Sequence, residues 1–263
     1  MFTKTKRNMH LFRVLAAHNR LCVTLRYALL WCLNRKIPVR INLSGHNIVI
    51  RTGSPDLYVA HSCLDGEFRA LAGAYDKNVK GLIIDAGGYI GTAALALSEL
   101  YPDATIVTIE PSSQNFAILE QNIAGKANIH AEKAALVSSD TENNAVLRNR
   151  GTGEWGFTTI EQPLGRTADV IESVGTITYD AILRKYGFSE VLIYKMDIEG
   201  GEYNLLKNPY WMSSTGILMI ELHDRIVSGC YKTFMEVCRG RYTYKAGKEK
   251  YVSVGQGYFR LPA

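Results

Sequence analysis

Two acidic residues near the middle of this chain each follow a short apolar run, and a glycine-rich stretch lies between them. Asp85 comes directly after residues 82–84, and Glu110 comes directly after residues 105–109. Such runs are typical of buried strands. The stretch between them contains the glycines Gly87, Gly88 and Gly91, which allow positive φ angles and let a ligand approach the backbone. The pattern predicts two parallel strands with carboxylates at their ends, joined by a glycine loop and a helix.

The spacing of these residues favours one ligand over another. Two carboxylates beside a helix N-terminus suit a ligand with hydroxyl or ammonium groups to donate and a carboxylate to place near free N–H groups. S-adenosylmethionine has hydroxyls, an ammonium group and a carboxylate. A dinucleotide is the alternative, but its G-x-G-x-x-G pattern, aligned on Gly91, finds Ala86 at the first glycine. Asp85 would also lie where a pyrophosphate has to bind, which like-charge repulsion disfavours. A tight turn without a ligand would not need paired glycines and two acids.

The elements that must hold these residues alternate as in a doubly wound α/β sheet. Further buried strands are predicted at 127–131, 191–196 and 217–220, with closing β segments at 242–244, 251–254 and 258–261. Helices are expected at 65–75, 92–100, 113–124, 178–186 and 230–239. Residues 39–63 alternate apolar and polar side chains and predict a short antiparallel element. We therefore divide the chain into an N-terminal extension, 1–55, and a catalytic domain, 56–263.

Composition supports a folded chain with an unusual first segment. The 263 residues are 47% hydrophobic and 21% charged, which excludes a disordered chain. Five scattered cysteines without a C-x-x-C pair indicate neither a disulfide framework nor a zinc site, and fit a reducing cytoplasm. Ten Lys and Arg and no acid precede Asp56, so the rest of the chain holds 20 basic against 25 acidic side chains.

Residues 10–34 predict a basic amphipathic helix with a break near Asn19. Its apolar part, 21–33, contains Arg26 and is too short to span a bilayer. One interpretation is a helix that packs on the catalytic domain or across a homo-oligomer. The other is peripheral docking of residues 1–40 to the inner face of an anionic membrane or to an acidic glycan carrier.

Residues 141–165 interrupt the alternation of strands and helices and predict a hairpin or lid. Trp155 in this segment either stacks on a sugar or aromatic substrate or anchors its own loop. Small side chains at Ala134 and Ala135 would permit close approach of an adenine ring, although simple packing explains them equally well.

Several blocks, taken together, identify a resemblance. IIDAGGYIGTAAL, TIEPSSQNFAILEQNI, AALVS, TYDAILRKYGFSEVLIYKMDIEGGEYNLLKN and ILMIELH resemble, in this order and spacing, the FkbM family of S-adenosylmethionine-dependent methyltransferases. The resemblance runs from about Asp56 to His223. It implies a class I methyltransferase fold, with a seven-stranded sheet and an antiparallel last strand. It also implies O-methylation of a hydroxyl on a sugar, glycan, nucleotide sugar or related natural product. The family usually has Asn where this chain has Tyr89.

Cofactor, catalytic and metal-binding roles follow as expectations. The predicted cofactor-binding residues are Asp85, Gly87, Gly88, Gly91, Glu110, Pro111, Ala134 and Asp197. Fold position places Asp197 and His223 at the ends of neighbouring strands, with His223 as the general base and Asp197 orienting it or the acceptor. Glu199 and Glu202 either interact with the dipole of the helix that they begin, or contribute to a divalent-cation site. The predicted ligands of such a cation, for example Mg²⁺, are Asp197, Glu199 and His223.

Other functional classes are weighed against this prediction. A methyltransferase fold that has lost turnover and serves as a glycan-binding module is the main alternative, and a NAD-dependent oxidoreductase is the enzymatic one. Nucleic-acid methylation is disfavoured, because the basic residues cluster in the first segment and no N/D-P-P-Y or F/W block that would stack a flipped base is present.

Overall fold

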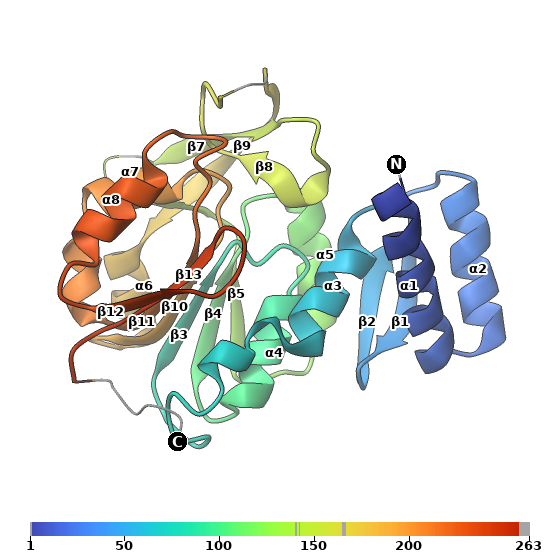
Figure 1. Cartoon of the computed structure of the whole chain (residues 1–263), viewed down its shortest axis with the longest axis horizontal. Coiled ribbons are helices and arrows are strands. Elements are labelled where there is room, and N and C mark those ends of the chain that lie inside the picture. Colours follow the sequence, from blue (N-terminus) through green and yellow to red (C-terminus); the bar gives the residue numbers. More distant parts are fainter. Residues whose placement is uncertain (1, 140, 142, 165–166, 258–263) are drawn as a thin grey trace.

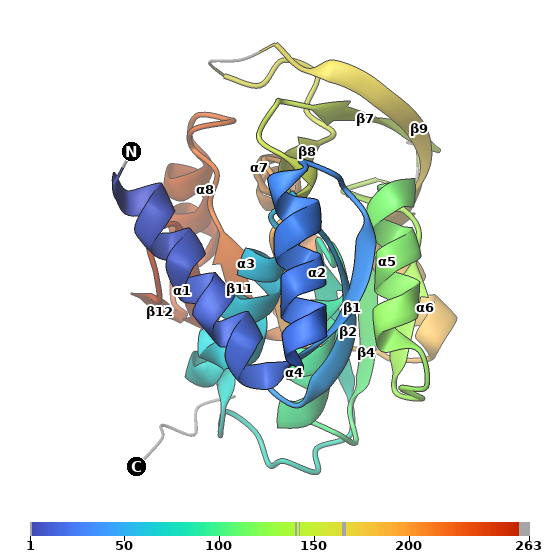
Figure 2. The ribbon, with the colours of Figure 1, turned by 90° about the vertical axis from the view of Figure 1, so that its right-hand side faces the viewer.

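The computed structural model describes residues 2–139, 141, 143–164 and 167–257, with side chains from residue 9 onward. A central sheet has helices on both faces, and a lobe formed by residues 2–55 lies at one end of the molecule (Figure 1). A second, smaller sheet lies over the carboxyl end of the central strands (Figure 2).

The N-terminal lobe consists of two helices packed on a β-hairpin. Its elements are α1 (Phe2–His18), α2 (Leu21–Cys32), β1 (Pro38–Leu43) and β2 (His46–Arg51). The predicted helix break is confirmed, and the antiparallel pairing is confirmed for residues 38–51, whereas residues 56–62 of the predicted β element are helical. Asn19 links them: its amide donates to the carbonyl of Leu15 (2.9 Å) and to that of Asn42 (2.8 Å) on β1. The break therefore fixes the chain where α1 meets the hairpin.

The central sheet confirms the predicted class I methyltransferase topology. Within the described residues it has seven strands in the order β12-β13-β11-β10-β3-β4-β5. These are β3 (Leu82–Ala86), β4 (Thr105–Ile109), β5 (Ile129–Glu132), β10 (Val191–Met196), β11 (Thr215–Glu221), β12 (Tyr242–Lys245) and β13 (Lys250–Val254). The strands β5, β4, β3, β10 and β11 are parallel, and β13 pairs antiparallel with β11 and β12.

Strand side chains alternate between two hydrophobic cores, as a sheet covered on both faces requires. Ile83, Ile106 and Ile193 face the core that includes α4 (Thr92–Leu100), α5 (Ser113–Ile123) and the N-terminal lobe. Ile84 and Tyr194 face the other core, with α6 (Tyr179–Tyr186), α7 (Glu202–Lys207) and α8 (Cys230–Val237). The extension and one face of the sheet thus share a continuous core.

The order of the strands creates one position for a ligand. After β3 the chain moves outward through β4 and β5, then returns to place β10 on the other side of β3. The crevice at the carboxyl ends of β3 and β10 is therefore the topological switch point, where open α/β sheets bind ligands. The glycine loop follows β3, and Asp197 follows β10.

The predicted hairpin at 141–165 is part of the smaller sheet, with the order β6-β9-β7-β8. Its strands are β6 (Ala135–Val137), β7 (Asn144–Asn149), β8 (Phe157–Thr158) and β9 (Asp169–Thr178). We call residues 144–160 the lid, because they form one wall of the cavity described below.

One helix begins earlier than predicted. The helix expected at 65–75 is preceded by α3 (Asp56–Ser62), which continues as a π-helical turn, Cys63–Glu67, and a short 3₁₀ turn, Arg69–Leu71. Pro55 precedes α3, and the backbone N–H of Asp56 donates to the hydroxyl of Ser54 (3.2 Å). These local contacts and the tertiary contacts of α3 outweigh the weaker sequence pattern. The β segment expected at 258–261 lies outside the described residues.

Candidate functional site

A cavity of about 490 Å³ lies at the switch point. Its floor is formed by the ends of β3, β4, β10 and β11, and its walls by α3 with its π-helical continuation and by the lid. The volume is in the range of small-molecule sites. Helix α3, which precedes the glycine loop in the chain, thus closes one side of the cavity.

The glycine loop is held against the ends of two neighbouring strands. Gly87 has φ +85°, and a Cβ there would lie 1.8 Å from the carbonyl oxygen of Asp197. A Cβ on Gly88 would lie 2.2 Å from the hydroxyl oxygen of Thr108. Both positions therefore require glycine, and the loop leaves its backbone exposed to the cavity instead of a side chain. Gly91, with φ +83°, is the N-cap of α4.

Glu110 is a fixed carboxylate in the cavity wall. Its Oε2 accepts from the backbone N–H of Tyr89 (2.9 Å), and its Oε1 accepts from the N–H of Ser112 (3.0 Å) and the amide of Asn115 (3.2 Å). Burial raises the pKa of Glu110 to about 7, against the opposing effect of these three donors. The carboxylate is oriented by donors behind it and lines the cavity in front.

Asp85 occupies a different place from the one that the pattern predicted. It is fully buried, and the residues that line the cavity do not include it. Its Oδ1 lies 3.0 Å from Lys195 Nζ, and its Oδ2 accepts from the hydroxyl of Thr108 (2.8 Å). Asp85 therefore lies under the glycine loop and fixes Lys195, which in turn donates to the carbonyl of Gly87 (2.8 Å).

Lys195 was not singled out from the sequence. Burial alone would lower its pKa, but the carboxylates of Asp85 and Asp197 outweigh burial and raise it. The lysine therefore stays charged in the cavity wall. A charged residue inside the otherwise apolar run 191–196 was the available indication, because such residues are rarely buried without a partner.

The opposite corner of the cavity is apolar. Ala134 and Pro111, both predicted to contact a cofactor, line it together with Leu136 and Phe157. Ala134 brings only a methyl group to this corner. The predicted cofactor residues other than Asp85 and Gly91 all lie in the cavity wall.

Two aromatic side chains meet at the rim of the cavity. Trp155 of the lid and Tyr58 of α3 form an edge contact, with ring centroids 6.0 Å apart. Trp155 is 42% exposed, and its Nε1 donates to the carbonyl of Thr152 (2.7 Å). The ring therefore anchors its own loop, as one of the two interpretations expected, and its stacking on a substrate stays a prediction.

His223 does not occupy the position of a general base. Its side chain is fully buried, and the cavity-lining residues do not include it. Its Nδ1 lies 3.0 Å from Glu202 Oε1. Burial lowers its pKa, but Glu202, Glu199 and Asp197 outweigh burial and raise the pKa to about 10. The imidazole lies behind Asp197 and Glu199 and not in the cavity wall, so the structure does not place it where the predicted general base would have to be.

Glu202 is likewise enclosed. Its carboxylate accepts from the backbone N–H groups of Ile198 (2.7 Å) and Gly200 (2.8 Å) and has no exposed surface. It thus satisfies the turn that begins α7, as the helix-dipole interpretation expected. A direct role toward a ligand is excluded for this side chain.

Asp197 and Glu199 line the cavity above the buried histidine. Asp197 Oδ1 and Glu199 Oε1 each lie 3.7 Å from His223 Nε2. Among the described residues, this nitrogen is buried without a hydrogen-bond partner. One ligand atom from each of the three predicted metal ligands lies within 4.8 Å of the others. Glu199 also has φ +51°, a strained conformation for a non-glycine residue, and its Oε2 pairs with Arg150 at 2.5 Å.

The half of the cavity beyond Asp197 carries both signs of charge. It is lined by Glu67, Glu221, Arg225, Lys248, Glu249 and Lys250. Lys250 Nζ pairs with Glu67 and lies 3.4 Å from Glu221. The burial of Glu221 raises its pKa. These residues come from distant segments, and nothing in their local sequence indicated that they share one wall.

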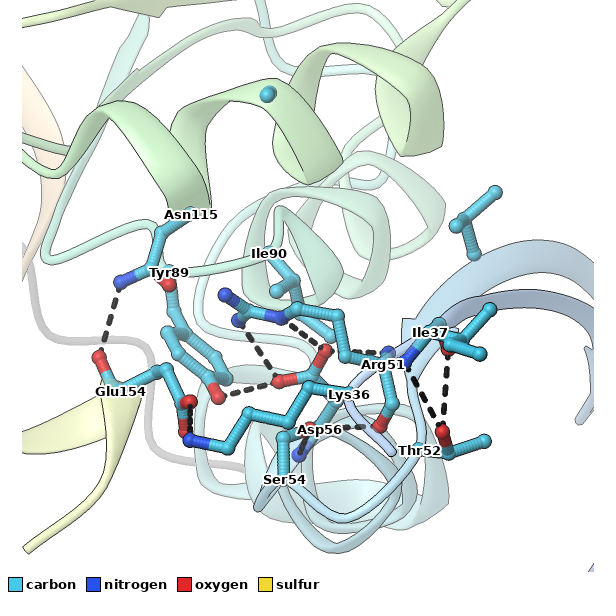
Figure 3. A network of polar contacts seen from close by, with 12 residues as sticks. Lys36, Ile37, Arg51, Thr52, Ser54, Asp56, Tyr89, Ile90, Asn115 and Glu154 are labelled. Carbon is cyan, nitrogen blue, oxygen red and sulfur yellow. Dashed lines mark hydrogen bonds and ion pairs between the residues drawn. The ribbon is translucent and has the colours of Figure 1, made fainter. Parts of the chain in front are cut away.

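A buried polar network ties the N-terminal lobe to this site (Figure 3). The Nε and NH2 groups of Arg51 at the end of β2 donate to the two oxygens of Asp56, each at 2.9 Å. The hydroxyl of Tyr89 in the glycine loop donates to the same carboxylate. Lys36 pairs with Glu154 of the lid. Tyr89, at φ +51°, is therefore held by contacts that Asn could not make at this distance from Asp56.

The chain is similar to known methyltransferases in sequence and in fold. The model of the methyltransferase FkbM domain matches residues 73–239, more than half of the chain. No curated protein matches the chain. Among solved structures it is similar to an O-methyltransferase from Bacillus cereus in complex with SAH (10% identity, 75% of this chain, 91% of that one, TM-score 0.41). It is also similar to a rRNA methylase from Streptococcus thermophilus (10% identity, 73% of this chain, 93% of that one, TM-score 0.41). A third similar structure is a precorrin-6y C5,15-methyltransferase from Geobacter metallireducens GS-15 (10% identity, 72% of this chain, 85% of that one, TM-score 0.38).

Proposed function

The chain belongs to the FkbM family of S-adenosylmethionine-dependent methyltransferases, and from this premise we propose that it methylates a hydroxyl of a sugar, a glycan or a nucleotide sugar. The observation that carries the proposal is the division of the cavity into two halves. One half has the glycine loop, Glu110 and an apolar corner. The other half has acidic and basic side chains next to each other. Such a mixture offers acceptors and donors to a molecule with many hydroxyls.

The residues of the first half fit S-adenosylmethionine. A Cβ at Gly87 would collide with the carbonyl oxygen of Asp197, so only glycine lets the loop pack against the end of β10 while it lines the cavity. Glu110 is oriented to accept from a pair of ribose hydroxyls, and the Ala134 corner suits an adenine ring. When bound, the cofactor supplies a methyl group on a positively charged sulfur. Asp197 and Glu199 line the cavity between the two halves and favour positive charge there.

Catalysis by this chain would rest mainly on orientation. Asp197 and Glu199 are the carboxylates that could hold an acceptor hydroxyl and take its proton, since His223 is enclosed behind them. Positioning of this kind can supply much of the rate of a two-substrate reaction. The tyrosine and tryptophan at the rim, Tyr58 and Trp155, offer aromatic faces to a sugar ring.

We also propose that Asp197, Glu199 and His223 hold a divalent cation. The support is His223 Nε2, which lies 3.7 Å from both carboxylates and has no hydrogen-bond partner within the described part of the chain. Binding of the ion would release the imidazole proton, because a histidine ligand is neutral. Carboxylates suit Mg²⁺ and Mn²⁺, and an imidazole favours transition ions, so Mn²⁺ meets the donor set better than the Mg²⁺ expected from the sequence. Such an ion would supply a positive charge that acidifies the acceptor hydroxyl.

One experiment tests substrate class and cation together. The protein is incubated with S-adenosylmethionine labelled on its methyl group and with nucleotide sugars or extracted glycans, in the presence of a chelator or of added Mg²⁺ or Mn²⁺. We expect label in an alkali-stable ether linkage. Transfer of label to the acceptor in the presence of the chelator would contradict a role for the cation. Label on nitrogen or carbon would contradict O-methylation.

Two other functional classes are separated by binding. A thermal-shift comparison should show stabilisation by S-adenosylhomocysteine and none by NAD. Stabilisation by neither ligand would favour a binding module without turnover. Stabilisation by NAD alone would favour an oxidoreductase.

A further inference from the structure

Helix α2 presents an apolar stripe to the outside of the molecule. Leu21, Leu25, Leu29 and Leu33 are spaced four residues apart along α2 and its C-cap, and are 73%, 59%, 61% and 59% exposed. This spacing places them on one face of a helix. Figure 2 shows α1 and α2 at the front of the lobe, away from the central sheet. A contiguous exposed stripe of this kind marks an interaction surface.

The face of α2 that packs on the protein is a different one. Tyr27 is buried, and its ring makes an edge contact with Phe12 of α1 at 5.8 Å between centroids. Val23 and Leu30 pack against the hydrophobic core. The lobe is therefore complete without the stripe, so its own folding does not account for the exposed leucines.

The charge around the stripe has one sign. The first 55 residues contain ten Lys and Arg and no Asp or Glu. Arg13, Arg20, Arg26, Arg35 and Arg40 are exposed. An apolar stripe within a basic surface matches the interface of an anionic bilayer, where leucines enter the acyl boundary and basic side chains meet the headgroups.

We propose that α2 docks this protein on the surface of an anionic lipid bilayer. The helix lies in the plane of the interface. Among the described residues, no helix combines the length and apolar character needed to cross a bilayer. Trp31, 40% exposed at the end of α2, has the amphipathic ring that is enriched at membrane interfaces.

A second copy of the chain is a poorer occupant of this surface. A symmetric contact places the same patch on both subunits, so two basic surfaces without acids would face each other. Like charges at such a contact are unfavourable. An anionic lipid surface complements both the apolar and the charged parts of α2.

Docking through α2 would also orient the cavity. Lys36, four residues beyond α2, pairs with Glu154 of the lid, which lines the cavity. Through this pair and the Arg51–Asp56–Tyr89 contacts, the lobe is a fixed extension of the site. The membrane would hold the lid at a constant distance from the lipid surface.

The test is sedimentation of the full chain with vesicles of phosphatidylcholine alone or mixed with phosphatidylglycerol. We expect binding to the mixed vesicles, weaker binding at high salt, and little binding to phosphatidylcholine. The double variant Leu25→Ser/Leu29→Ser should bind about tenfold or more weakly, because two apolar side chains no longer leave water. The matched control is Val170→Ser, which removes a side chain that is 66% exposed on β9, and it should bind like the wild type.

Three outcomes would overturn the proposal. They are absence of binding to either vesicle, equal binding to both, and unchanged binding of the double variant. Light scattering that shows a dimer lost in the double variant, without vesicle binding, would assign the stripe to self-association instead. Circular dichroism and S-adenosylhomocysteine binding check that each variant is folded.

Discussion

Lys195 Nζ lies 3.0 Å from Oδ1 of Asp85, which is fully buried beneath the glycine loop. The same ammonium donates to the carbonyl of Gly87. An acid that the sequence pattern assigned to the cofactor therefore acts on the loop through a lysine. This pair and the hydrogen bond from Tyr89 to Asp56 both hold the glycine loop in place.

Replacing Lys195 by Met should destabilise the protein by about 3–5 kcal/mol, because the carboxylate of Asp85 is left buried without its charged partner. Denaturation by urea measures this loss. Lys77→Met, at an exposed lysine, is the control and should change stability by less than about 0.5 kcal/mol. The double variant Asp85→Asn/Lys195→Met should recover part of the loss. A single variant as stable as the wild type would show that the pair does not support the loop.

Replacing Glu110 by Gln should weaken S-adenosylhomocysteine binding by about 1.5–3 kcal/mol, or roughly tenfold to a hundredfold, because hydrogen bonds to a charged acceptor are lost. Calorimetric titration measures the affinity. Gln keeps the volume of the side chain, and Glu120→Gln on the exposed side of α5 is the matched control. Equal affinity of the Glu110 variant and the wild type would remove Glu110 from the cofactor site.

Cofactor affinity should depend on pH through Glu110. Burial raises its pKa from 4.5 to about 7, so the carboxyl of the free protein is increasingly protonated below that pH. Only the ionised form accepts from two hydroxyls, and affinity for S-adenosylhomocysteine should fall by up to about tenfold per pH unit below 7. Titrations at pH 6, 7 and 8 measure this. The Gln variant should lose that dependence, and an identical slope in both proteins would contradict the assignment.

The same shift sets the sign of a stability effect. The folded protein without cofactor binds this proton more tightly than the unfolded chain does. The contribution of Glu110 to stability is therefore present below about pH 4.5 and is lost as pH rises through 7. Thermal melts should show the melting temperature of the wild type falling relative to that of the Gln variant as pH rises from about 4.5 through 7.

Tyr89→Phe should destabilise the protein by about 1–3 kcal/mol, because Asp56 loses a hydrogen bond to a charged acceptor in a buried site. Tyr231→Phe removes a hydroxyl from a half-exposed ring and serves as the control. Unfolding by urea measures both. Equal stability of the two variants would mean that the hydroxyl does not hold the loop.

Asp197→Asn should reduce turnover of the true acceptor by about a hundredfold or more, as expected for a group that orients or deprotonates the nucleophile. S-adenosylhomocysteine affinity should change much less, because Glu110 and the glycine loop remain. Radiometric methyl transfer and calorimetry separate the two effects. Glu236→Gln on the exposed part of α8 is the control. Full turnover by the Asn variant would place the acceptor elsewhere in the cavity.

The sequence predicted those features that depend on local pattern. Apolar runs, glycines and strand-end acids located β3, β4 and β10, and the blocks that resemble the FkbM family predicted the order of the central sheet. The helix break at Asn19 and the cap of α6 at Thr178 were visible in the same way, because capping residues act over a few positions.

Features that depend on partners distant in sequence could not be predicted. Strand position put His223 at the correct edge, but its enclosure follows from Glu202 and the turn before α7. Asp85 turns away from the cavity because Lys195, on a strand far along the chain, supplies its counter-charge. The start of α3 at Asp56 likewise depends on Arg51 and Tyr89.

The shared core and the Asp56 contacts have a practical consequence for anyone seeking a minimal catalytic fragment. A chain shortened to begin at Asp56 would retain every cavity-lining side chain, yet that acid would lose its guanidinium partner and α5 would lose the apolar cover of the hairpin. We expect such a fragment to aggregate or to bind S-adenosylmethionine more weakly than the full chain does.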